Sequence, residues 1–176
     1  RYITKRSEIT GTIVFQGEEV AQSIVGVNWN EEKFLEERLV LVDGSFDAMK
    51  KNRKGLILSQ DVVDQLNLQL QDRVDVKLRT LTGQQNVGDF ILVGISYDPG
   101  LFSSLSGYAN LGYINELLTL EENQYMTLGI FLQDIQYIEP SAEKYYEALS
   151  DDVDLFDRAE LDSESEQNPV MAMMSQ

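Results

Sequence analysis

Apolar and charged side chains alternate most clearly between Val74 and Leu78. Val74, Val76 and Leu78 are separated by Asp75 and Lys77. A period of two is expected of a strand that has one face buried and the other in water. We therefore predict a half-buried strand at this position.

The neighbouring segments complete a region of short strands and helices. Phe90–Tyr97 is apolar on both faces, which is typical of a central strand. Ser59 is a suitable N-cap for a helix that presents Val62, Val63 and Leu66 on one face. The elements expected here are strands at 55–58, 74–78, 90–97 and 108–111 and helices at about 60–67 and 114–118.

The two ends of the chain predict a second group of elements. Ile9–Phe15 and Val20–Val27 are rich in β-branched residues and read as a hairpin. A short helix is expected between Asn30 and Arg38, and Asp43 with Gly44 reads as a turn. Near the other end, a strand at 126–132, a helix at 140–149 and a strand at 153–156 form a βαβ unit, whose strands should pair in parallel.

Composition limits the classes of partner. The chain has 176 residues, 43% of them apolar, which is enough for a folded domain with a core. Its 30 acidic and 14 basic residues give a formal charge of -16. Nucleic acid is excluded as a partner, because so acidic a protein repels a phosphate backbone. The basic cluster Lys50, Lys51, Arg53 and Lys54 is either a solvated connector or a binding patch.

Catalytic chemistry is not predicted. The chain has no His and no Cys, so the usual zinc ligands, thiol nucleophile and imidazole base are missing. Ser96 lacks the spacing of a nucleophile elbow, and Asp43 with Asp47 reads as a turn rather than an acid/base pair. An acidic cluster reads as a solvated turn rather than a calcium site, and consists of Asp151, Asp152, Asp154 and Asp157. We predict no enzyme activity, no metal and no cofactor.

Aromatic side chains supply the candidate contact residues. Tyr97, Leu101 and Phe102 lie in one Pro- and Gly-containing loop, where apolar side chains often mark a partner surface. The alternative is that this loop folds back over its own lobe. Trp29 is interpreted as a core residue rather than a binding anchor.

Several segments together resemble one protein family over about residues 9–158. They are SIVGVNWNEE, GLILSQDVVDQLNLQLQDRVDVKL, FILVGISYDPG and FLQDIQYIEPSAEKYYEAL. Their residue patterns and their order along the chain are similar to those of the MacB-like periplasmic core domain. This domain is found in FtsX-like permeases of ABC transporters, including the lipoprotein-releasing ones.

The resemblance implies an α+β fold with two lobes. A Porter-like lobe containing the βαβ unit would come from residues 1–50 and 119–161, and a mostly β Sabre-like lobe would be inserted at 51–118. Residues 162–176 would form a linker toward a transmembrane helix. No apolar run reaches the roughly 18 residues that span a bilayer, so the membrane would be reached only through flanking helices absent from this chain. A first residue other than Met fits an excised loop.

The resemblance also implies a function. The domain would lie on the periplasmic or extracytoplasmic face of the bacterial inner membrane, and would couple cytoplasmic ATP hydrolysis to the handling of a partner or substrate. Its partners would be a cognate ATP-binding subunit and a periplasmic protein or second permease subunit. The alternative is a free-standing soluble binding or hydrolytic protein with an acidic cleft.

Two positions depart from the family pattern. Gln71 stands where the family usually has Gly before Asp72, which predicts a less tight turn or a different local geometry. The turn expected at Thr82–Gly88 is short, whereas permeases that recruit a lipoprotein carrier have a long hook in this part of the domain. The sequence therefore argues against a hook mechanism.

Overall fold

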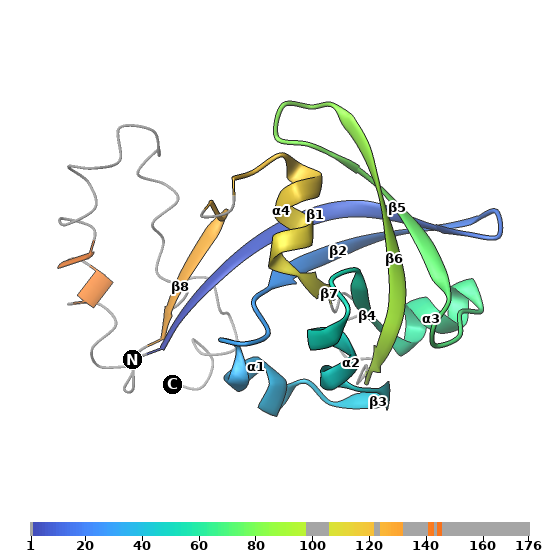
Figure 1. The fold of residues 1–176 in the computed structure, drawn as a ribbon, viewed down its shortest axis with the longest axis horizontal. Helices are drawn as coiled ribbons and strands as arrows, with labels where there is room; N and C mark the ends of the chain where they lie inside the picture. Colours follow the sequence, from blue (N-terminus) through green and yellow to red (C-terminus); the bar gives the residue numbers. More distant parts are fainter. Residues whose placement is uncertain (1, 98–105, 122–123, 132–140, 143, 146–176) are drawn as a thin grey trace, which may run out of the picture. The chain divides into compact units, whose positions relative to one another are not determined.

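The computed structural model of the chain describes residues 2–97, 106–121, 124–131, 141–142 and 144–145. These residues form a mixed fold of strands and helices (Figure 1), as predicted. The strands are β1 (Tyr2–Phe15), β2 (Glu18–Val27), β3 (Leu41–Gly44), β4 (Gly55–Ser59), β5 (Arg73–Arg79), β6 (Gln85–Ser96), β7 (Gly107–Asn110) and β8 (Thr127–Phe131). The helices are α1 (Lys33–Arg38), α2 (Phe46–Lys51), α3 (Gln60–Leu66) and α4 (Leu111–Leu118).

The chain divides into two compact units. The larger unit is Ile3–Gly129, and the smaller one combines Arg1–Tyr2 with Ile130–Gln176. In the smaller unit, the ring centroids of Tyr2 and Phe131 lie 5.8 Å apart. Both hydrophobic cores that the structure describes belong to the larger unit.

Six strands of the larger unit pair in a closed ring. β1 and β2 form the predicted antiparallel hairpin, in which Arg6 lies opposite Val27. The pairing then continues from β2 through β7, β4, β6 and β5. β5 returns to β1, with Ile13 opposite Val76, and this closes the ring. β3 is added to β6, and β8 is added to β1.

Burial along the strands follows their sequence patterns. In β5, Val74, Val76 and Leu78 are buried and the charged residues between them are exposed, which confirms the predicted half-buried strand. Every residue of β4 is buried. β4 and the second half of β6 pair in parallel, with Gly55 opposite Ile91, as expected of strands that are covered on both faces.

Two cores lie on opposite faces of β4 and β6. One core draws on all six strands of the ring and on α3 and α4, and includes Leu56, Leu58 and Phe90. Ile57 of β4 and Val93 of β6 belong to the second core, which is covered by α1, β3 and α2. Figure 1 shows these three short elements following one another along one border of the sheet.

Some predicted elements have other bounds or were missed. β3 and α2 occupy residues that the sequence assigned to a turn and a connector. α2 begins after Ser45, whose hydroxyl accepts the Ala48 N–H at 3.1 Å as an N-cap. α1 begins at Lys33 rather than near Asn30, because the N–H of Glu31 bonds the Asn28 carbonyl in a preceding turn. Most of the predicted helix at 140–149, the strand at 153–156, the acidic cluster at 151–157 and the linker at 162–176 lie outside the described residues.

The compact units have bounds that differ from those of the predicted lobes. β1 and β2, from the predicted Porter-like part, share a ring and a core with β4–β7, from the predicted Sabre-like part. The division into Porter-like and Sabre-like lobes stays a prediction. The predicted short turn between β5 and β6 is present, since the Thr80 N–H bonds the Gln84 carbonyl at 2.8 Å.

Gln71 keeps the backbone geometry that glycine adopts most easily. Its φ is +75°, and its N–H donates to the Leu92 carbonyl at 2.8 Å. This hydrogen bond holds the left-handed conformation without a glycine. The predicted difference from the family's geometry at this turn stays a prediction. An L side chain in that conformation costs about 1–2 kcal/mol.

We expect Gln71→Gly to raise the free energy of unfolding by about 1 kcal/mol, because it relieves this conformational cost. The matched control is Gln69→Gly, two residues earlier and also exposed, where φ is not positive. There the extra freedom of the unfolded chain should lower stability by about 0.5–1 kcal/mol. Urea unfolding of both variants measures the two effects, and a shift of the same sign in both would contradict this explanation.

Candidate functional site

Tyr97 is the one predicted contact residue that the structure describes. Its side chain is 55% exposed at the end of β6, and its N–H donates to the Val40 carbonyl at 2.9 Å. Leu101 and Phe102 lie outside the described residues. Contact of this loop with a partner therefore stays a prediction.

Two exposed valines lie beside Tyr97. Val40 is 62% and Val42 52% exposed, whereas Leu41 between them packs against the second core. Val42 is the extra residue of a β-bulge, since Leu41 pairs with Ser96 and Asp43 with Ile95. We call Val40, Val42 and Tyr97 the β3 surface. A group of exposed apolar side chains is a common feature of contact sites.

β3 also offers a strand edge. Among the described residues it pairs with β6 and with no other strand. An edge strand presents backbone donors and acceptors that a partner strand can bind. The strand ends at Gly44, whose N–H donates to the Asp43 carboxylate at 2.7 Å. The interpretation of Asp43 and Gly44 as a turn was wrong, because both residues belong to β3 and pair with β6.

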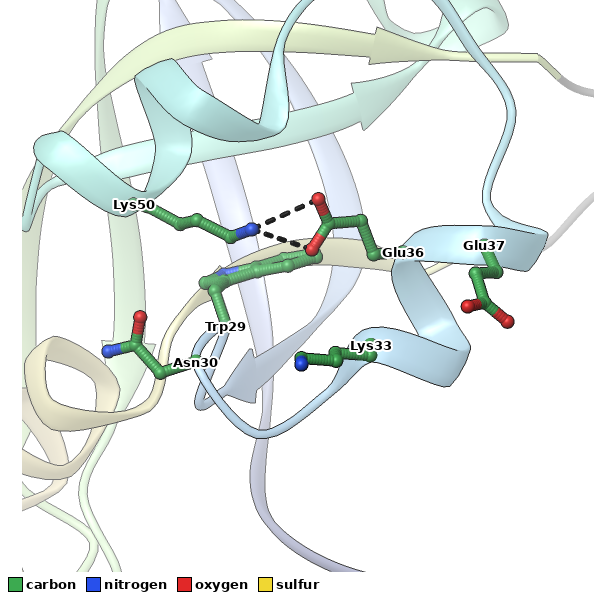
Figure 2. A pocket seen from close by; sticks show the side chains of 6 residues that line it. All are labelled: Trp29, Asn30, Lys33, Glu36, Glu37 and Lys50. Carbon is green, nitrogen blue, oxygen red and sulfur yellow. Dashed lines mark hydrogen bonds and ion pairs between the residues drawn. The ribbon is translucent and has the colours of Figure 1, made fainter.

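A depression of about 460 Å³ lies between α1 and α2 (Figure 2). At its base, Trp29 is 2% exposed and packs against Phe46 and Tyr108, with ring centroids at 5.6 Å and 6.3 Å. This confirms that Trp29 is a core residue. The Lys50 ammonium donates to both carboxylate oxygens of Glu36, at 2.7 Å and 3.0 Å. The lining residues are Trp29, Asn30, Lys33, Glu36, Glu37 and Lys50.

The basic cluster at 50–54 is largely engaged in ion pairs. Lys50 pairs with Glu36 of α1, Arg53 with Glu116 of α4, and Lys54 with Asp89 of β6. These contacts join α2 to α1 and the start of β4 to α4 and β6. The cluster therefore acts as a set of cross-links between elements, which supports the connector interpretation over that of a binding patch.

Lys54, Asp89 and Tyr113 form a group whose pKa values are shifted by their mutual contacts and by burial. The Lys54 ammonium lies 2.6 Å from the Asp89 carboxylate, and this hydrogen bond lowers the pKa of Asp89 and raises the pKa of Lys54. Burial raises the pKa of Tyr113, whose hydroxyl donates to the Asp89 carbonyl at 3.1 Å. Lys54 therefore stays charged and Tyr113 stays protonated, the reverse of what a general base or nucleophile requires.

Lys54→Met is expected to raise the pKa of Asp89 back toward its ordinary value of 3.8. Because folding lowers this pKa, the ion pair stabilises the protein above the unfolded pKa and loses that contribution as the pH falls through the folded pKa. Carboxyl NMR titration measures the change, with Lys51→Met as the control that leaves the pair intact. An unchanged Asp89 titration in Lys54→Met would contradict the assignment.

Ser96, the other candidate catalytic residue in the described part of the chain, has a structural role. Ser96 is fully buried, and its hydroxyl donates to the Leu58 carbonyl at 3.3 Å. In the described part of the chain, His, Cys, Asp and Glu form no group of three or more that could hold a metal ion. None of the helices described there is long and apolar enough to cross a membrane.

Comparisons with known proteins identify the fold. No protein-family model and no curated protein matches the chain. A solved structure does match: the extracellular domain of the noncanonical ABC-type transporter YknZ from Gram-positive bacteria, with a TM-score of 0.61 and 14% identity, covering 86% of this chain and 75% of that one. The fold is that of a transporter-permease extracellular domain.

A second solved structure agrees with this permease fold. It is a domain of a proposed permease protein from Porphyromonas gingivalis, with a TM-score of 0.53 and 13% identity, covering 89% of this chain and 67% of that one. The resemblance to MacB-like periplasmic domains is thus confirmed at the level of the fold.

Proposed function

We propose that this chain is the extracytoplasmic domain of an ABC transporter permease. The observation that carries the proposal is the likeness to the YknZ extracellular domain over 86% of the chain. In this role the domain is not an enzyme. It works with a cognate ATP-binding subunit and responds to ATP hydrolysis on the other side of the membrane.

A polar network on β1 is the proposed route of that response. Arg6 bonds both carboxylate oxygens of Glu32, at 2.8 Å and 2.9 Å. The adjacent Ser7 hydroxyl donates to the Asn115 side chain of α4 at 2.7 Å, and Asn115 donates to the Gln124 carbonyl at 2.7 Å. A displacement of β1 is thereby passed to α1, α4 and the segment that leads to β8.

The remaining assignments follow from the same proposal. Residues 1–50 and 119–161 make the Porter-like lobe, 51–118 the Sabre-like lobe, and 162–176 the linker toward a membrane helix. The β3 surface, with the loop from Tyr97 to Phe102, is the proposed contact for a periplasmic protein or a second permease subunit. The exposure of Val40, Val42 and Tyr97 supports this assignment.

The test of this function uses the full-length gene product. We expect apolar spans of about 20 residues before Arg1 and after Gln176, and co-purification of an ATP-binding subunit from detergent-solubilised membranes. A gene product that lacks both spans and purifies alone from the soluble fraction would reject the proposal in favour of a free-standing binding or hydrolytic protein.

A further inference from the structure

The indole of Trp29 has a buried donor that is not satisfied. Its Nε1 atom has no hydrogen-bond partner among the residues that the structure describes, although Trp29 is 2% exposed. Buried indole N–H groups normally have an acceptor, because leaving one unpaired is costly. Trp29 also lines the depression between α1 and α2. A ligand that brings an acceptor into this depression can satisfy the donor.

The side chains around Trp29 favour an acceptor that carries negative charge. Figure 2 shows the Lys33 ammonium reaching into the depression, while the Glu37 carboxylate points away from it. Lys50 and Glu36 neutralise each other in their ion pair. Lys33 therefore adds a positive charge to the indole N–H donor.

The Lys50–Glu36 ion pair covers the indole ring and can be displaced by a ligand. It extends over the indole ring in Figure 2, and its two side chains are 32% and 28% exposed. A partly exposed ion pair contributes little to stability, so its displacement costs little. The free energy gained when a ligand satisfies a buried donor exceeds the free energy lost when this ion pair is displaced.

We propose that this depression binds an acidic side chain of a partner protein. One carboxylate oxygen accepts the Trp29 N–H, and its charge faces Lys33. A volume of about 460 Å³ accommodates such a side chain with its flanking peptide groups. The site lies between α1 and α2, and it does not depend on the transporter proposal.

The test uses the one tryptophan of the chain as its reporter. The indole ¹H–¹⁵N NMR signal is followed while the tripeptide acetyl-Gly-Glu-Gly-amide is added at constant ionic strength. We expect a saturable shift with a dissociation constant in the millimolar range. The isosteric acetyl-Gly-Gln-Gly-amide is the matched control peptide, and we expect it to leave the signal in place.

Two exposed lysines provide matched variants. Lys33→Gln should weaken binding of the Glu peptide about tenfold, since it removes the charge-assisted contact. Lys51→Gln makes the same change in net charge outside the depression and should bind as the natural sequence does. The spectra themselves show whether each variant is folded.

Three results would overturn the proposal: no saturable shift with the Glu peptide, an equal shift with the Gln peptide, or equal affinities of the two lysine variants. None of them bears on membrane topology or on the ATP-binding subunit, so failure here is distinguishable from failure of the proposed function.

Discussion

Replacing Arg6 by Met is expected to lower the free energy of unfolding by about 3 kcal/mol, since the change removes the ion pair that holds both oxygens of a buried carboxylate. Glu32 is 1% exposed, and Arg6 holds both of its oxygens. Met keeps most of the apolar stem of Arg6 and removes the charge. The Arg6 side chain is itself 30% exposed, so water reaches part of the site and the loss stays at the lower end of the range for buried pairs.

Two further variants isolate the cause of that loss. Lys77→Met breaks the Lys77–Glu19 pair, whose side chains are 55% and 51% exposed, and should change stability by about 0.5 kcal/mol or less. Combining Arg6→Met with Glu32→Leu should recover part of the loss, because the buried carboxylate is then removed as well. Urea unfolding gives the free energy of unfolding of the natural sequence, the two single variants and the double variant. If Arg6→Met were as mild as Lys77→Met, Glu32 would not depend on its partner.

Gly44→Ala is expected to cost about 3 kcal/mol, as the sum of a left-handed backbone strain and a backbone clash. Gly44 has a φ of +85°, and an added Cβ would lie 2.2 Å from the Val93 carbonyl oxygen and 2.6 Å from the Gly94 Cα. Neither atom can move without disturbing β6. The substitution should therefore separate the end of β3 from β6.

The control for Gly44 is Gly17 in the β1–β2 turn. Gly17 has a φ of +94°, and no described atom lies within 4 Å of its added Cβ. Gly17→Ala carries the backbone strain alone and should cost about 1–2 kcal/mol. Thermal or urea unfolding gives the difference between the two variants, and hydrogen exchange of the β3 amides reports the local separation. Equal losses in both variants would show that the contact with Val93 is not close.

The elements that the sequence predicted well are those with a long and clear period. Val74–Leu78 alternates over a whole strand, and the hairpin at 9–27 combines two β-branched runs with a turn that contains Gly17. β3 and α2 span only four and six residues, which is too short for either period to be recognised. The closure of the ring through Ile13 and Val76 joins distant strands, and pairing of that kind leaves no local signal.

The site was predicted only in part, for the same reason. Tyr97 was identified because it adjoins Pro and Gly in an apolar loop, and it is exposed as expected of a contact residue. Val40 and Val42 were missed, because Val40, Leu41 and Val42 are all apolar and show no alternation that separates exposed from buried positions. Glu32 falls within the helix that was predicted between Asn30 and Arg38, whereas its partner Arg6 lies 26 residues away. Neither the burial of Glu32 nor the unsatisfied indole N–H of Trp29 can be predicted from composition or spacing.

The most direct test of the central claim, an extracytoplasmic permease domain, is thiol labelling of the full-length gene product in osmotically intact cells. The chain contains no Cys, so Gln84→Cys, in the exposed turn between β5 and β6, adds the one thiol that this domain presents. A membrane-impermeant maleimide is predicted to label it before lysis, while a thiol on the ATP-binding subunit reacts only after lysis. Labelling of Gln84→Cys only after lysis would contradict the proposed location and, with it, the proposed function.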